Sequence, residues 1–109
     1  MPFNGTEGKV ISMRNAKSMI AGHKKTKAFA AAAKPGKTIG GFYGKKVLLR
    51  ILKQRNCVGI RYYHAVNAKR QQTLVLVGED KEGHLLIKTM VNEGPICPPV
   101  CDKSHYFKI

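Results

Sequence analysis

The centre of this 109-residue chain reads Thr73-Leu74-Val75-Leu76-Val77, a run without a charged side chain. Such an unbroken apolar run is typical of a strand that is covered on both faces, so we expect it to be the central strand of a sheet. Asp80-Lys81-Glu82-Gly83 then supplies a tight turn, with a glycine available for positive φ, before a strand over residues 84–90. Residues 57–63, before the central run, complete the prediction of a three-stranded antiparallel meander.

The strand predicted before the central run alternates with period two. Because successive side chains of a strand point to opposite faces, Val58, Ile60 and Tyr62 are predicted to face the core. The same alternation directs Arg61 and Tyr63 outward. We therefore expect a half-buried strand with a cation and an aromatic ring on its free face.

A helix is predicted over residues 44–55, just before this strand. Its apolar side chains recur on one side, and its basic side chains surround the rest of the helix. The apolar residues are Val47, Leu48, Ile51 and Leu52, and the basic residues are Lys45, Lys46, Arg50, Lys53 and Arg55. One face is expected to pack on the sheet, while the other is wholly cationic.

A further helix is predicted near the N-terminus, where Ser12 can act as the N-cap. The apolar stripe of this helix consists of Met13, Ala16, Met19 and Ile20. We expect the stripe to pack in the core and the helix to end or weaken at Gly22. Residues 23–34 have high helix propensity from their alanines but no strong amphipathic pattern, which predicts only a conditional helix.

The predicted fold class is α+β, with an N-terminal helix, a second helix, the antiparallel meander and a proline-rich C-terminal tail. Pro35-Gly36 and Gly40-Gly41 interrupt both helix and strand periodicities, which indicates a linker. Residues 1–39 are therefore expected to form the first helix and a basic arm, and residues 40–109 a small α+β domain. From Asn92 onward, the prolines predict an ordered tail without regular structure.

The distribution of charge is extreme. The net charge is +14 at pH 7, and residues 8–78 hold sixteen lysines and arginines but no aspartate or glutamate. A surface without internal charge compensation creates a long-range positive field, which attracts polyanions. The same charge also fits a basic surface that only keeps the protein in solution. Because lysines outnumber arginines, attraction to a phosphate backbone is favoured over the reading of bases.

We expect a non-catalytic basic module that binds nucleic acid or another polyanion by electrostatics. The predicted contact residues are Lys24, Lys25, Lys27, Lys34 and Lys37 of the arm, Lys45, Lys46, Arg50 and Lys53 of the helix, Arg61 and Tyr63 of the strand, and Lys69 and Arg70 of the following turn. An exposed tyrosine can also stack on an unpaired base. The alternative is a structural or adaptor subunit of a larger assembly, which binds an acidic protein surface or another copy of itself.

Catalytic chemistry has little material in this chain. Only six acidic residues exist, and five of them follow residue 78, so acid/base catalysis by paired carboxylates is disfavoured. Cys57, His64 and Glu79 include the residue types of a nucleophile, a base and an orienting group, but no spacing brings them together. We therefore predict that the protein is not an enzyme.

Cys97 and Cys101, with His105 four residues later, are the candidate zinc ligands. A fourth ligand would have to come from Cys57 or His64 through folding. The alternatives are free thiols near the C-terminus or a disulfide between Cys97 and Cys101. No cofactor is expected, and zinc is the metal that this pattern would suit.

No part of the chain approaches the ~20 apolar residues of a membrane-spanning helix, so no membrane span is expected. The apolar run Ala28–Ala33 follows basic residues as in a signal peptide, but its six residues are too few and begin too late. Three cysteines, an odd number, fit a reducing compartment better than a secreted disulfide framework. The expected location is the cytoplasm.

Four segments together resemble a family of small uncharacterised proteins from Bacteroidota. They are Gly40-Gly41-Phe42-Tyr43-Gly44-Lys45, Cys57–Tyr63, Leu74–Gly78 and Cys97-Pro98-Pro99-Val100-Cys101, so the resemblance covers roughly residues 40–101. It implies a shared architecture and contributes no functional residues. The first helix and the linker are more basic here than in the family pattern, which makes the charge a property of this member.

Overall fold

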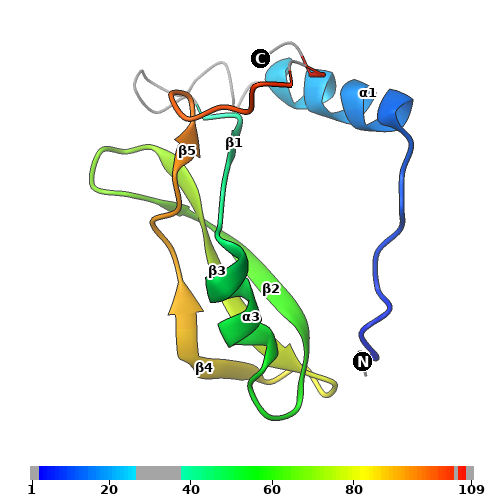
Figure 1. Cartoon of the computed structure of the whole chain (residues 1–109), viewed down its shortest axis with the longest axis vertical. Helices are drawn as coiled ribbons and strands as arrows, with labels where there is room; N and C mark the ends of the chain where they lie inside the picture. Colours follow the sequence, from blue (N-terminus) through cyan, green and yellow to red (C-terminus); the bar gives the residue numbers. More distant parts are fainter. Residues whose placement is uncertain (1–2, 27–37, 105, 108–109) are drawn as a thin grey trace.

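A computed structural model of the chain describes residues 3–26, 38–104 and 106–107 (Figure 1). The architecture is α+β, as the sequence predicts. The elements are α1 (Met13–Lys24), β1 (Gly40–Gly41), α3 (Lys45–Leu52), β2 (Cys57–Val66), β3 (Gln72–Asp80), β4 (Leu85–Val91) and β5 (Ile96–Cys97). The predicted residues Lys27, Lys34, Lys37 and His105 lie outside the described residues.

The main sheet has the strand order β2-β3-β4 and is antiparallel throughout, which confirms the predicted meander with β3 at its centre. Four consecutive residues of β3, Leu76 to Glu79, are buried. Since neighbouring side chains of a strand point to opposite faces, this burial means that the middle of β3 is covered on both sides. Val77 is only 1% exposed.

The turn between β3 and β4 forms where the sequence predicts it. The carboxylate of Asp80 accepts hydrogen bonds from the backbone N–H groups of Glu82 and His84, each at 2.9 Å. These bonds hold the pKa of Asp80 below its ordinary value, with the His84 N–H as the largest cause. Gly83 adopts a φ of 92°, a conformation that side chains disfavour, so the glycine is required there.

Helix α3 packs on one face of the sheet through Ile51, which is fully buried. Gly78 of β3 allows this close approach, because an added Cβ would lie 3.2 Å from Ile51 Cγ2 and 2.8 Å from Gln54 Nε2. The helix ends at Leu52, earlier than predicted, and Asn56 in the following turn has a positive φ of 68°. A tight reversal into β2 therefore shortens the helix.

The strand register assigns residues of β2 to the two faces of the sheet. Ile60 is paired with Gly78 and Tyr62 with Leu76, so Tyr62 lies on the face that α3 covers, whereas Tyr63 lies on the opposite face. The predicted alternation is confirmed from Gly59 onward, whereas a register shift between Cys57 and Gly59 interrupts it at Val58. The prediction that Tyr62 faces the core is wrong, since it is 57% exposed. The eight residues of α3 span about 12 Å, too short to cover a ten-residue strand of about 33 Å.

Helix α1 begins as predicted, because the Ser12 side chain accepts a hydrogen bond from the Asn15 backbone N–H at 3.1 Å. It continues through Gly22 to Lys24, so the predicted end at Gly22 is wrong. The expected burial of its apolar stripe is also wrong, since no residue of α1 is buried and Met19 is 65% exposed. Figure 1 shows the reason: α1 lies away from the main sheet, and α3 is the helix that covers it.

A second, two-stranded sheet joins the segment before α3 to the C-terminal part of the chain. Gly40 pairs with Cys97 and Gly41 with Ile96, and the flanking Phe42 N–H donates to the Pro95 carbonyl at 2.8 Å. The prediction of no regular structure after Asn92 is therefore wrong over residues 96–97. Strand pairing uses backbone groups alone, so two glycines are enough to form β1.

The core is small. Among the described residues, the buried positions are Thr38, Ile51, Leu76, Val77, Gly78, Glu79 and Cys97. The hydroxyl of Thr38 donates to the Gln72 carbonyl at 2.9 Å, and Glu79 is paired with a cation, so both polar members of this set have partners. A core this small leaves most apolar side chains near solvent.

Candidate functional site

The cationic face of α3, which we define as Lys45, Lys46, Arg50 and the C-cap residue Lys53, consists of exposed side chains. Successive residues of a helix are about 100° apart, so these four surround Leu49 on the side away from the sheet. The opposite side holds the buried Ile51. Packing of the apolar side thus directs the cations to solvent.

Among the described residues, no carboxylate neutralises the cationic face of α3. In the part of the chain that the structure describes, the ion pairs join Arg61 to Glu79 and His84 to Asp80, and neither involves α3. The exposed carboxylate of Glu7 accepts the backbone N–H groups of Asn4 and Gly5, which lower its pKa. The carboxylates of Glu7, Glu79 and Asp80 thus have partners outside α3.

The cations at the start of α3 do not serve helix stability. Lys45 and Lys46 are in the first turn, where the helix macrodipole favours negative side chains and disfavours positive ones. The N-cap residue, Gly44, supplies no side-chain hydrogen bond. The local electrostatics of the helix therefore do not account for lysines at these two positions.

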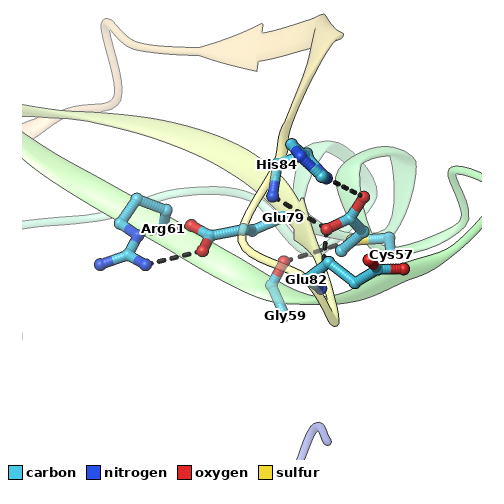
Figure 2. Close-up of polar contacts among 7 residues, drawn as sticks. Cys57, Gly59, Arg61, Glu79, Glu82 and His84 are labelled. Atoms are coloured by element: carbon cyan, nitrogen blue, oxygen red, sulfur yellow. Dashed lines mark hydrogen bonds and ion pairs between the residues drawn. The ribbon is translucent and has the colours of Figure 1, made fainter. Parts of the chain in front are cut away.

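Arg61, a predicted contact residue, is engaged within the sheet (Figure 2). Its Nε and a terminal nitrogen donate to the two carboxylate oxygens of Glu79 at 2.5 and 2.7 Å. The Glu79 side chain is only 8% exposed, and the bonded guanidinium holds its pKa below the ordinary value. The Phe3 ring covers the guanidinium at 5.5 Å from the ring centroid. Arg61 thus compensates a buried charge.

The other predicted cations do not join the cationic face of α3. Lys69 and Arg70 lie in the β2–β3 turn, which is built on the Asn67 side chain and extends away from α3 (Figure 1). Lys24 and Lys25 end and cap α1. The structure therefore brings together the residues predicted on the helix and separates them from those on the arm and the turn.

Two aromatic side chains on β2 lie on the same face of the sheet as α3. The rings of Tyr62 and His64 meet edge to face, with centroids 5.7 Å apart, and both residues are exposed. The sequence reasoning assigned Tyr62 to the core because it alternates with Val58 and Ile60. The exposure of Tyr62 follows from the length of α3 relative to β2, which the alternation of residues in β2 does not indicate.

An open groove of about 570 Å³ lies between the N-terminal segment and β2. The residues that line it are Phe3, Gly5, Glu7, Val58, Gly59, Ile60, Arg61, Tyr62, His64, Glu79 and Asp80. Three of these eleven are acidic, half of the six acidic residues in the chain. Phosphate groups are therefore better suited to the cationic face of α3 than to this groove, whose lining also includes the rings of Tyr62 and His64.

Cys97 and Cys101 are joined in a disulfide, the alternative to zinc ligation that their spacing left open. Neither sulfur is a thiolate in this state. In the described ranges, which exclude His105, no three metal-ligating side chains gather at one point.

The residues Cys57, His64 and Glu79 do not form a catalytic group. The Cys57 thiol donates to the Gly59 carbonyl at 3.2 Å, and Glu79 is occupied by Arg61. Cys57 and His64 lie seven residues apart on one strand, a separation of about 23 Å. Glu79 also faces the side of the sheet opposite His64.

Neither described helix has the length and apolar character needed to cross a lipid bilayer. Comparisons with protein-family models, with curated proteins and with solved structures found no match. The resemblance to the Bacteroidota family therefore stays a prediction, and the roles of the residues are argued from their geometry alone.

Proposed function

We propose that this protein is a non-catalytic binding module for polyanions, and that it binds nucleic acid through the cationic face of α3. The observation that carries the proposal is that no described carboxylate pairs with these four exposed cations, on a helix whose other side is anchored by Ile51. A rigid support keeps the charges together at no further entropic cost, so phosphates can be neutralised by several cations at once.

The proposed attraction is to the phosphate backbone. Three of the four cations are lysines, which act as point charges and lack the planar fork with which arginine recognises a base edge. Neutralising about four phosphates of a single strand gives a slope near −3 for log K against log salt. Binding is thus expected to depend steeply on salt and weakly on nucleotide sequence.

The test is the triple variant Lys45→Glu, Lys46→Glu, Arg50→Glu, compared with a control that has the same total charge. The control, Lys9→Glu, Arg14→Glu, Lys17→Glu, also changes three exposed cations, so the net charge falls from +14 to +8 in both variants. At ~0.1 M salt the α3 variant should lose retention of nucleic acid, while the control keeps most of it. Equal retention by the α3 variant and the wild type would overturn the proposal.

A second candidate function is that of a structural or adaptor subunit in a larger assembly. It is favoured by the exposed large apolar side chains of this chain. A typical isolated domain would cover many side chains of this kind. They include Val10, Ile11, Met13, Met19, Phe42, Val66, Ile87, Met90, Val100 and Tyr106. The mass of the purified protein in light scattering distinguishes the two functions, because a packed interface persists at ~0.5 M salt whereas phosphate contacts weaken.

A further inference from the structure

The Tyr62–His64 pair is an aromatic surface on the side of the sheet that bears α3. The rings of the two residues touch edge to face at 5.7 Å, and Tyr62 is 57% exposed. The exposed part of Tyr62 therefore includes ring surface that no described residue covers fully. A planar ligand can stack on such a ring.

The aromatic pair lies toward the start of α3, near the residue that precedes the helix. The hydroxyl of Tyr43 donates to the Leu74 carbonyl at 2.7 Å, and Leu74 is the cross-strand partner of His64. Helix α3 starts at Lys45, two residues after Tyr43. Gly78, which is paired with Ile60, meets Ile51 near the end of α3. The helix therefore ends near the level of Ile60, and its start lies toward His64.

We infer that the Tyr62–His64 pair stacks on unpaired nucleobases, so that the ligand of this surface is single-stranded nucleic acid. The inference rests on the proposed function, because the cationic face of α3 holds the phosphates of the same strand. Bases of a duplex are stacked on one another and present only their edges, whereas an unpaired base offers its face to an aromatic ring. Tyr62 supplies the main stacking surface, and His64 orients it.

Tyr63 provides an internal comparison for this assignment. It is adjacent in sequence and 49% exposed, but it lies on the face opposite α3, beside the Arg61 that Glu79 holds. The two tyrosines thus match in residue type, strand and exposure, and they differ in whether the cationic face of α3 is on their side. Of the two tyrosines, only Tyr62 lies on the side of the sheet that bears α3.

The first experiment separates the contribution of base stacking to the affinity from the contribution of phosphate binding. The full chain is titrated with an oligo-dT of about 15 nucleotides and with an abasic oligonucleotide of equal length and charge, followed by fluorescence anisotropy of an end label. The wild type should bind oligo-dT at least about fivefold more tightly than the abasic strand. Tyr62→Leu should remove this preference, and Tyr63→Leu should keep it.

The second experiment reports stacking directly. The chain contains four tyrosines and no tryptophan, so its ultraviolet emission comes from tyrosine. Oligo-dT should quench this emission in the wild type and in Tyr63→Leu, and the quenching should be smaller in Tyr62→Leu. The abasic strand should quench little in all three proteins.

The outcomes separate the inference from the proposed function. Equal affinity of the wild type for oligo-dT and the abasic strand, or a preference that survives Tyr62→Leu, overturns the stacking site and leaves phosphate binding by α3 in place. A preference lost in Tyr63→Leu also overturns it. Unchanged binding by the Lys45→Glu, Lys46→Glu, Arg50→Glu variant overturns the proposed function itself.

Discussion

Arg61 and Glu79 lie on neighbouring strands, and their side chains form a bidentate pair that closes over a nearly buried carboxylate. A carboxylate in this position loses much of its hydration energy on burial. The folded state is therefore destabilised unless a partner compensates the charge. The pair therefore ties β2 to β3 and neutralises the charge of one partly exposed cation.

Arg61→Ala should lower the free energy of unfolding, because it leaves the Glu79 carboxylate buried without its donors. The loss should appear as a shift of the urea midpoint at pH 7 to a lower urea concentration. The Phe3 contact is lost too, so Phe3→Leu is the control for that part, and it should have a smaller effect.

The effect of Arg61→Ala should also depend on pH. Arg61 lowers the pKa of Glu79 below its ordinary value of 4.5, so the pair stabilises the wild type above that pH. The contribution is lost as pH falls through the depressed pKa. Wild type and Arg61→Ala should therefore converge in stability as pH falls below about 4. A difference that stays constant from pH 7 to pH 3 would contradict the pairing.

The elements that position α3 include the short β1–β5 sheet, which joins the residues just before the helix to the segment after β4. Gly94 allows this contact: a Cβ added there would lie near the Phe42 carbonyl oxygen, closer than any nonbonded contact permits, and 3.0 Å from the Tyr43 ring. The start of α3 is therefore held by backbone groups far away in the sequence.

Gly94→Ala should destabilise the protein by about 1–3 kcal/mol, because the backbone must shift to relieve the overlap. Gly40→Ala, on the strand of the same small sheet, places its Cβ in open space and should stay within about 0.5 kcal/mol of the wild type. Urea unfolding of both variants gives the comparison. Equal stabilities would show that this close approach does not hold the start of α3.

The whole molecule combines a net charge of +14 with few buried residues. Burial of apolar side chains therefore contributes little to the free energy of folding, and repulsion among the cations opposes this contribution. The described ion pairs remove little of this repulsion, because they involve two carboxylates. A bound polyanion would relieve it. Under the proposed function, affinity for nucleic acid and stability of the fold would therefore be linked.

The melting temperature should rise when sodium chloride is increased from ~0.02 to ~0.5 M, because salt screens the repulsion between like charges. Each kcal/mol gained corresponds to about 4–8 °C for a chain of this size. The Lys9→Glu, Arg14→Glu, Lys17→Glu variant, with a net charge of +8, should show a smaller rise. A melting temperature that is independent of salt in the wild type would contradict this account.

Much of the fold follows from local patterns along the chain. The apolar run of β3, the Ser12 cap of α1 and the Gly83 turn each depend on a few neighbouring residues, and each was predicted correctly. The cationic face of α3 was predicted for the same reason, since helical spacing alone separates its cations from Ile51. Periodicity and turn chemistry are short-range properties, so they can be recognised without the three-dimensional structure.

Other features depend on contacts between residues far apart in sequence. Arg61 meets Glu79 through the β2–β3 register, β1 exists because β5 reaches it, and Tyr62 is exposed because α3 is shorter than the strand beneath it. Periodicity gives the face on which a side chain lies, but coverage of that face depends on the lengths and positions of other elements. Charge and element types were thus evident along the chain, whereas the pairing of Arg61 and the aromatic surface beside α3 arose only when the elements packed together.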